Sequence, residues 1–210
     1  RAAAAADRAR RAVAAIADRV SARLTPIAAS LGPALGVPDW ATALFAEEVV
    51  RGGPAFGVSL ALSAVEPGLR SAAQLLAWHV VSPGEAVTGT VLPVDALYDV
   101  MDTVYATPTI LVVARLSGEE EVPAGAVAVL AADAPDVLSH LAVRARNGGT
   151  LLAACFDAGP LEELRALEGQ ALTVSTSAAG GVTWKKVGEG KGGPQAVASA
   201  ATAAASKTAA

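Results

Sequence analysis

The character of the sequence changes near Pro83, and this change constrains the fold more than any other feature. Before Pro83, alanines and larger apolar side chains recur every three or four residues, which is the spacing of amphipathic helices. After it, short runs rich in β-branched residues alternate with short helical patterns. The sequence therefore predicts an all-helical segment over residues 1–83, followed by an α/β domain over residues 84–187.

The helical segment is expected to contain three stretches. One amphipathic helix covers Ala2 to Leu24, and Asp39 can cap a second helix that runs from Trp40 to about Val50. A third helix, or a pair of helices, follows and is interrupted near Pro67. Helical spacing then continues from Leu69 to Trp78.

The α/β part shows β-rich runs with short helical patterns between them. The runs are Thr90 to Val94, Thr109 to Ala114, Ala126 to Ala131, Thr150 to Ala154, Ala171 to Thr176 and Val182 to Val187. Helices are expected at His140 to Asn147 and at Pro160 to Leu167, whereas Asp95 to Tyr105 is ambiguous. Propensity alone does not choose how the strands are ordered.

The last part of the chain, residues 188–210, differs from both segments. It begins with Gly, Lys and Pro and continues with Ala, Ser and Thr, with almost no large apolar side chain. Such a composition cannot bury a core, and we predict a flexible linker.

Charge and cysteine content exclude several classes of partner. The net charge of -4 and the absence of a long basic run argue against a nucleic-acid-binding surface. The single cysteine, Cys155, cannot form an internal disulfide and is expected to be an inert strand residue. No uninterrupted apolar stretch reaches the length of about 20 residues that spans a bilayer. We therefore expect neither a nucleic acid nor a membrane as partner.

One of the two histidines, His140, stands at the start of a short basic helix. Neutral imidazole is a good nucleophile near pH 7, because free histidine has a pKa of about 6.5. A phosphate on this ring would be stabilised by free amides and the dipole at the helix N-terminus, and by Arg144, which lies on the same helix face. Arg146 points further round the helix and would reach the phosphate only from another direction. Ser139 is a natural N-cap that could also orient the ring or its phosphate.

The Ser139-His140 pair, followed by Ala145-Arg146, resembles the phosphohistidine motif of the swivelling domains in pyruvate phosphate dikinase and phosphoenolpyruvate-utilising enzymes. The longer context resembles the alpha-glucan, water dikinase family, the starch dikinases, over roughly residues 24–187. This context includes Gly118 to Pro123, Pro135 to Asn147 and Cys155 to Asp157.

The resemblance implies a swivelling β/β/α phosphohistidine domain that works as one part of a larger kinase. An ATP-grasp domain of the same chain, absent here, would bind ATP and Mg²⁺ and place the β-phosphate on His140. His140 would then pass it to a glucosyl hydroxyl of starch, an alpha-glucan, while Ser139, Arg144 and Arg146 stabilise the phosphate. No cofactor is expected to bind to this segment itself, and the resemblance implies a plastid (chloroplast) location. Because the chain begins at Arg1 and not at Met, we expect a piece of a longer protein that is catalytically incomplete alone.

Two other functions stay open at this point. A mobile domain of a phosphoenolpyruvate-using phosphotransferase would share the Ser-His and Ala-Arg pairs. A non-catalytic scaffold domain would have the fold without the chemistry.

His79 and the three tryptophans are expected to be structural. His79 has no acidic or cysteine neighbour in the sequence that would complete a ligand set. Trp40, Trp78 and Trp184 could stack on sugar rings, but their helix and strand settings favour anchoring of the core or of an interface.

The acidic residues near the histidine are also expected to be structural. Asp133 and Asp136 are interpreted as caps or turn formers. Consecutive carboxylates, as in Glu119-Glu120-Glu121, cannot all converge on one ion, so this run is expected to make surface or interdomain contacts. We assign no metal site.

Overall fold

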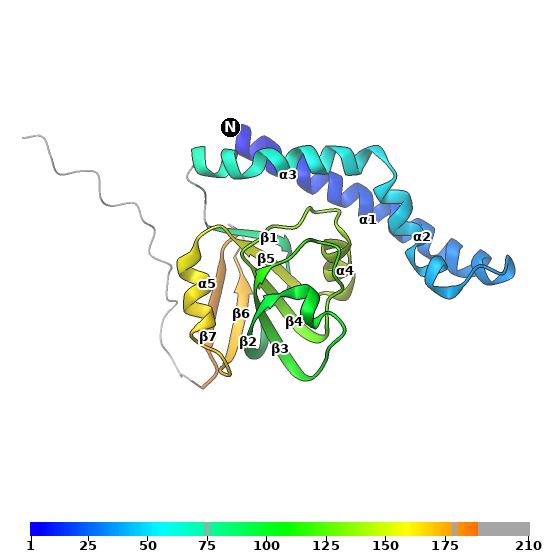
Figure 1. Cartoon of the computed structure of the whole chain (residues 1–210). Coiled ribbons are helices and arrows are strands. Elements are labelled where there is room, and N and C mark those ends of the chain that lie inside the picture. Colours follow the sequence, from blue (N-terminus) through cyan, green and yellow to red (C-terminus); the bar gives the residue numbers. More distant parts are fainter. Residues whose placement is uncertain (74, 76, 178–179, 189–210) are drawn as a thin grey trace, which may run out of the picture.

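Three helices lie across one end of a seven-stranded sheet in the computed structural model of the chain (Figure 1). The structure describes residues 1–73, 75, 77–177 and 180–188. The linker expected over residues 188–210 lies, beyond Gly188, outside the described residues. Within the described residues, no helix is both long and apolar enough to cross a membrane.

The helical layer consists of α1 (Ala2–Ala34), α2 (Asp39–Arg51) and α3 (Pro54–Ala72). Helix α1 is longer than expected, because it continues through Pro26 and Pro33. A proline inside a helix removes a backbone hydrogen bond. Both α2 and α3 pack against α1.

The sheet contains β1 (Trp78–Ser82), β2 (Val87–Ala96), β3 (Val104–Arg115), β4 (Ala124–Ala131), β5 (Leu151–Cys155), β6 (Ala171–Thr176) and β7 (Val182–Lys186). Their order is β1-β5-β4-β3-β2-β6-β7. The four central strands β5, β4, β3 and β2 are parallel, and the strands at both edges are antiparallel to their neighbours. Every predicted β-rich run forms a strand, so the expected α/β class is confirmed.

Short helices connect the strands. The two predicted helices are confirmed as α4 (His140–Gly148) and α5 (Ala158–Arg165). The ambiguous stretch after β2 contains a 3-10 helix, Leu97–Val100.

The helix expected to continue from Leu69 to Trp78 is wrong at its C-terminal end. Helix α3 stops at Ala72, and Trp78–Ser82 forms the edge strand β1, antiparallel to β5. Aromatic and β-branched side chains favour a strand here, and Trp78 gains a buried place in the core. The all-helical part therefore ends before residue 83.

The sheet has an apolar core on both faces, because successive side chains of a strand point to opposite sides. On β3, Ile110 and Val112 pack into the core beside α5, whereas Leu111 and Val113 pack into the core beside α4. A smaller apolar cluster contains residues of α1 and α2 together with Val137 of the loop before α4. That loop is where the helical layer meets the α/β domain.

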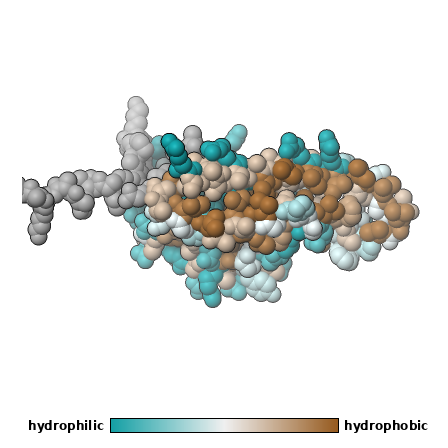
Figure 2. All heavy atoms as spheres, turned by 90° about the horizontal axis from the view of Figure 1, so that it is seen from above, coloured by the Kyte–Doolittle hydropathy of each residue, from teal (hydrophilic) through white to brown (hydrophobic). Residues whose placement is uncertain are grey.

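The helical layer also carries exposed apolar side chains. They include Ile27 and Leu31 on α1 and Leu60 and Val65 on α3. Figure 2, seen from above the helices, shows apolar atoms gathered along this layer.

Candidate functional site

Two loops meet at one edge of the sheet because β3 and β4 are parallel. The chain leaves β3 through Leu116 and leaves β4 through Ala132, and carboxyl ends of parallel strands lie at the same edge. The backbone N–H of Leu116 donates to Oδ2 of Asp133 at 3.1 Å, which joins the two loops. Residues of the β3–β4 loop are thereby placed beside the start of α4.

Helix α4 begins at His140 because Ser139 caps it. Ser139 has an extended backbone, and its Oγ accepts a hydrogen bond from the backbone N–H of Ala142 at 3.3 Å. Gly149, with φ of 67°, ends the helix in the left-handed conformation that favours glycine. The predicted N-cap role of Ser139 is confirmed.

Both ring nitrogens of His140 face carboxylates. Nε2 lies 2.6 Å from Oε1 of Glu121, which belongs to the β3–β4 loop. Nδ1 lies 2.9 Å from Oε2 of Glu47, which belongs to α2. The side chain of His140 is 14% exposed, so the ring is more covered than a freely presented nucleophile would be.

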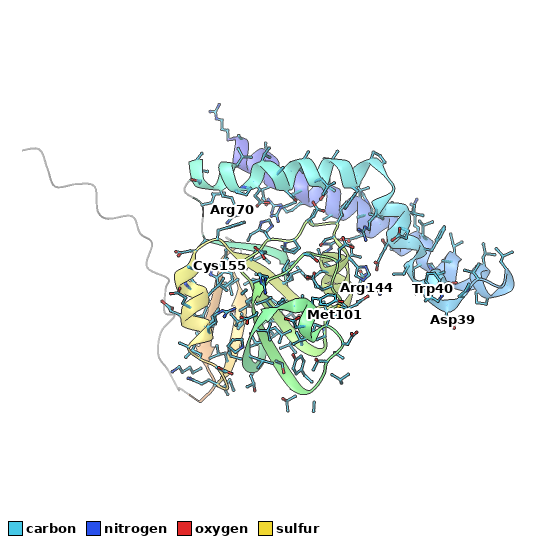
Figure 3. The ribbon with its side chains drawn as sticks, in the orientation of Figure 1. Asp39, Trp40, Arg70, Met101, Arg144 and Cys155 are labelled. Atoms are coloured by element: carbon cyan, nitrogen blue, oxygen red, sulfur yellow. The ribbon has the colours of Figure 1, made fainter. Side chains whose placement is uncertain are left out.

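Arg144 lies on the same face of α4 as His140, as the spacing predicts, but it reaches the ring through Glu47. Its Nε lies 3.1 Å from Oε1 of Glu47 and 3.7 Å from Oε1 of Glu121. Figure 3 shows Arg144 on the side of α4 that faces the helical layer. The structure thus brings His140, Arg144 and two glutamates together.

Arg146 points to a different place. Its Nε lies 3.3 Å from Oδ1 of Asp18 on α1, and its Nη1 donates to the carbonyl oxygen of Val137 at 2.7 Å. The structure therefore does not bring Arg146 together with His140, and Arg146 instead ties α4 to α1.

The expectation of free amides at the start of α4 is wrong for two of them. The N–H of Leu141 donates to the carbonyl oxygen of Gly118 at 2.8 Å, and the N–H of Ala142 donates to Ser139. Gly118 has a φ of 97°, and a Cβ there would lie 3.0 Å from Cβ of Ser139, so only glycine fits this close approach. The loop itself uses the amides that a phosphate was expected to meet.

The Glu119-Glu120-Glu121 run diverges to three partners. Glu119 pairs with Arg51 of α2 at 2.9 Å, and Glu121 contacts His140. Glu120 is buried, contrary to the surface position expected, and accepts the N–H groups of Ser117 and Gly118 at 2.7 Å each. The interdomain contact expected of this run is confirmed for Glu119.

The turn-forming role expected of Asp136 is confirmed, whereas Asp133 joins two loops through Leu116. Oδ1 of Asp136 accepts the N–H of Leu138 at 2.8 Å. The same carboxylate accepts the hydroxyls of Ser59 at 2.7 Å and Ser63 at 2.8 Å, both from α3. Asp136 therefore anchors the helical layer on the loop that leads to His140.

Sequence reasoning missed Glu47 as part of the site. The available signal was its spacing, because Glu47 and Val50 fall on one helix face, and that face is the buried one. A glutamate on an apolar face needs a buried partner, but the sequence alone does not say that the partner is His140.

His79 forms a second, structural cluster. It is buried, its Nε2 contacts a guanidinium nitrogen of Arg10, and its Nδ1 lies 2.8 Å from Oε1 of Glu66. Burial lowers the pKa of His79, and the Arg10 and Arg70 cations lower it further despite the opposing effect of Glu66. His79 thus joins β1 to α1 and α3, beside a cavity of about 640 Å³ between these helices and the strand. Among the described residues, no cluster of three or more His, Cys, Asp or Glu could hold a metal ion.

Cys155 is buried at the end of β5. Its thiol donates to the carbonyl oxygen of Asp157 at 3.1 Å. Burial raises the pKa of the Cys155 thiol to about 11, so the thiol stays protonated and unreactive at neutral pH. The inert role expected of this residue is supported.

The tryptophans divide into two groups. Trp78 and Trp184 pack edge to face with ring centroids 6.4 Å apart, as expected for core anchors. Trp40 is 70% exposed at the tip of the helical layer, so of the two expected roles it does not anchor the core, and anchoring of an interface stays a prediction (Figure 3).

The mixed sheet with His140 at the start of α4 defines the class: an α/β domain of the phosphohistidine type, preceded by helices. The family model for the alpha-glucan water dikinase, phosphohistidine-like domain matches residues 77–192. The chain belongs to this family. The match favours a starch dikinase over a phosphoenolpyruvate-using transferase.

Similar proteins agree with this assignment. The chain is 45% identical over 183 residues to alpha-glucan water dikinase 1, chloroplastic, of Arabidopsis thaliana, an alignment covering 87% of this chain and 13% of the relative. It is 48% identical over 166 residues to alpha-glucan water dikinase, chloroplastic, of Solanum tuberosum, covering 79% of this chain and 11% of the relative. The chain thus spans about an eighth of the length of these relatives. No solved structure gives a significant match.

Proposed function

We propose that this chain is the phosphohistidine carrier domain of a starch dikinase, in which His140 accepts the β-phosphate of ATP and passes it to a glucosyl hydroxyl of starch. The single observation that carries the proposal is the place of His140. It is the first residue of a capped helix inside the region that matches the family, and Arg144 lies one turn away on the same side.

The chemistry consists of two transfers. The lone pair of a ring nitrogen of His140 attacks the β-phosphorus, the bond to the α-phosphate breaks, and AMP leaves with the electron pair. A water oxygen attacks the γ-phosphorus, the P–O bond that joins it to the β-phosphate breaks, and inorganic phosphate is released. A glucosyl hydroxyl oxygen then attacks the phosphorus on the ring, the N–P bond breaks, and the hydroxyl proton passes to solvent. The covalent intermediate replaces one difficult transfer by two easier ones.

The residues around the ring have different proposed roles. We propose that Arg144, which lies beside Glu47 one turn from His140, is the cation that meets a phosphate on the ring, because its planar guanidinium suits phosphate oxygens. Ser139 fixes the start of the helix, and so the position of the ring. Arg146 can contact the phosphate only after it releases Asp18, so we propose that its first role is to hold α1.

The proposed partners of this domain are a nucleotide-binding domain and the glucan. We propose that an ATP-grasp domain of the same polypeptide holds ATP and Mg²⁺, and that the acceptor is the alpha-glucan, in the plastid. The names of the relatives, which call them chloroplastic water dikinases, support this part of the proposal.

The test is a labelling experiment with the chain, the nucleotide domain of a starch dikinase and ATP labelled at the β-phosphate. We expect label on His140 that is lost in acid and stable in alkali, and no label from γ-labelled ATP. His140→Ala should carry no label while its circular dichroism spectrum stays that of the wild type. Label from phosphoenolpyruvate would support the phosphotransferase alternative, and no label from either donor would support a scaffold.

A further inference from the structure

Glu47 lies on α2, outside the region that matches the phosphohistidine family model, yet its carboxylate contacts the ring of His140. We propose that Glu47 is the positioning residue of His140: it holds the Nδ1–H group and leaves Nε2 as the nitrogen that accepts the phosphoryl group. The inference rests on the proposed carrier function of His140. It also means that the helical layer completes the site.

Burial distinguishes the two glutamates that contact the ring. The side chain of Glu47 is 8% exposed, whereas the side chain of Glu121 is 50% exposed. A buried carboxylate must receive hydrogen bonds from the protein, since water cannot supply them. Glu121 can turn into solvent at little cost, so Glu47 is the contact that the ring must keep.

The donors that can satisfy Glu47 are few. Nε of Arg144 lies 3.1 Å from Oε1 and Nδ1 of His140 lies 2.9 Å from Oε2. Within the described part of the chain, neither Oε2 of Glu47 nor Nε of Arg144 has an aligned hydrogen bond, so the contact with Nδ1 of His140 is a close ion-pair distance. Oε2 therefore still needs a donor, and a hydrogen on Nδ1 of His140, 2.9 Å away, would supply it.

The ring of His140 cannot donate hydrogen bonds to both carboxylates and also act as a nucleophile. Donating to Glu47 and Glu121 together requires hydrogens on both nitrogens, and such an imidazolium ring has no lone pair to attack phosphorus. A neutral ring has one N–H. Since Glu47 is the buried partner, the neutral ring keeps its hydrogen on Nδ1 and presents the lone pair of Nε2.

Glu47 also suits the charge that develops during transfer. When Nε2 forms its bond to phosphorus, the ring gains positive charge while its hydrogen stays on Nδ1. A carboxylate at Nδ1 stabilises that charge and holds the ring orientation, as the aspartate does for the histidine of serine hydrolases. The leaving oxygen takes the electron pair of the broken P–O bond, so no further reactant is needed.

Contacts on both sides of Glu47 hold it in place. Ala46 and Val50 are buried beside it on α2, and Arg51 pairs with Glu119 of the β3–β4 loop. Ser59 of α3 donates to Asp136 in the loop before α4. Arg51 therefore holds α2 on the β3–β4 loop, and Ser59 holds α3 on the loop before α4.

The test measures the tautomer of His140 directly, by ¹⁵N NMR of the ring in the whole chain at a pH where the ring is neutral. We expect hydrogen on Nδ1 in the wild type. In Glu47→Gln we expect this preference to be lost, and phosphorylation by phosphoramidate to slow about 10- to 100-fold, the range found when a carboxylate that orients a metal-bound histidine is removed. Glu48→Gln, at the adjacent exposed glutamate of α2, should match the wild type in both measurements.

Hydrogen on Nε2 in the wild type would overturn the proposal, even if Glu47→Gln failed to fold. A folded Glu47→Gln variant with unchanged tautomer and rate would overturn it as well. The carrier function is tested separately by the labelling with ATP. If the tautomer depends on Glu47 but ATP never labels His140, the carrier function fails and the positioning role stands. If ATP labels His140 but its tautomer is the same in the wild type and in Glu47→Gln, only the positioning role of Glu47 fails.

Discussion

Oε1 of Glu121 and Nε2 of His140 lie 2.6 Å apart, so a carboxylate occupies the position from which a phosphoryl donor must approach Nε2. The Glu121 side chain is half exposed and belongs to a loop, whereas the Glu47 carboxylate on the other side of the ring is buried. The two glutamates are therefore expected to have opposite effects on the reaction.

Glu121→Ala should speed phosphorylation of His140 by phosphoramidate. The gain should be about two- to fivefold, which corresponds to up to about 1 kcal/mol, the upper range for a contact of an exposed charged side chain. The rate can be followed by ³¹P NMR, with Glu163→Ala on the exposed face of α5 as the matched control. A slower reaction in Glu121→Ala would mean that Glu121 assists the transfer and does not block it.

Arg144 and Arg146 should differ in what their loss does. Arg144→Ala should lower the rate of phosphoryl transfer at least about tenfold, as expected for a lost hydrogen bond to a charged group. Arg146→Ala should change this rate less but lower the free energy of unfolding by about 1–3 kcal/mol, because Asp18 and the Val137 carbonyl lose their partner. Labelling with β-labelled ATP and urea denaturation measure the two effects. Equal loss of transfer in both variants would contradict the different placements of the two arginines.

Ser59 should be important for attaching the helical layer. Its side chain is fully buried and donates to Asp136 at 2.7 Å. Ser59→Ala should lower the free energy of unfolding by about 1.5–3 kcal/mol, the usual range for a hydrogen bond to a charged group. Ser63→Ala is the control, since Ser63 contacts the same carboxylate from a more exposed position and should cost less. Identical melting temperatures for Ser59→Ala and the wild type would show that the contact contributes nothing.

His79 should make the fold sensitive to mild acid. Its pKa in the folded state lies below the ordinary value of 6.5, so the unfolded chain takes up a proton first as the pH falls. The wild type should therefore lose stability as the pH drops from about 6.5 through the folded-state pKa of His79. His79→Gln should flatten this part of the profile. Melting temperatures of both proteins between pH 5 and pH 7.5, measured by circular dichroism, check the prediction, and parallel profiles would contradict it.

Local sequence predicted most of the helices and strands and the part of the site that lies on α4. The β-branched runs, the Ser139 cap and the four-residue step from His140 to Arg144 depend on neighbours in the chain, and periodicity reports such relations. The strand at Trp78–Ser82 was missed because it is short and its place is decided by pairing with β5. Local helical spacing cannot detect such pairing.

The part of the site that Glu47 and the Gly118 loop contribute depends on contacts between residues far apart in the sequence. Glu47 is held beside His140 by two contacts of the helical layer: Ser59 of α3 donates to Asp136, and Arg51 of α2 pairs with Glu119. Both contacts join residues that are far apart in the sequence. The loss of free amides at α4 likewise depends on how the Gly118 loop folds against Ser139. A single sequence does not show which distant residues come into contact.

The most direct test of the carrier function is to find the phosphate. Full-length dikinase containing this domain should be incubated with ATP without glucan and digested at alkaline pH, and the peptide with residue 140 examined by mass spectrometry. We expect phosphate on His140, which disappears when glucan is added and phosphorylated glucan forms. An unmodified His140 peptide, with AMP still released and the glucan still phosphorylated, would contradict it.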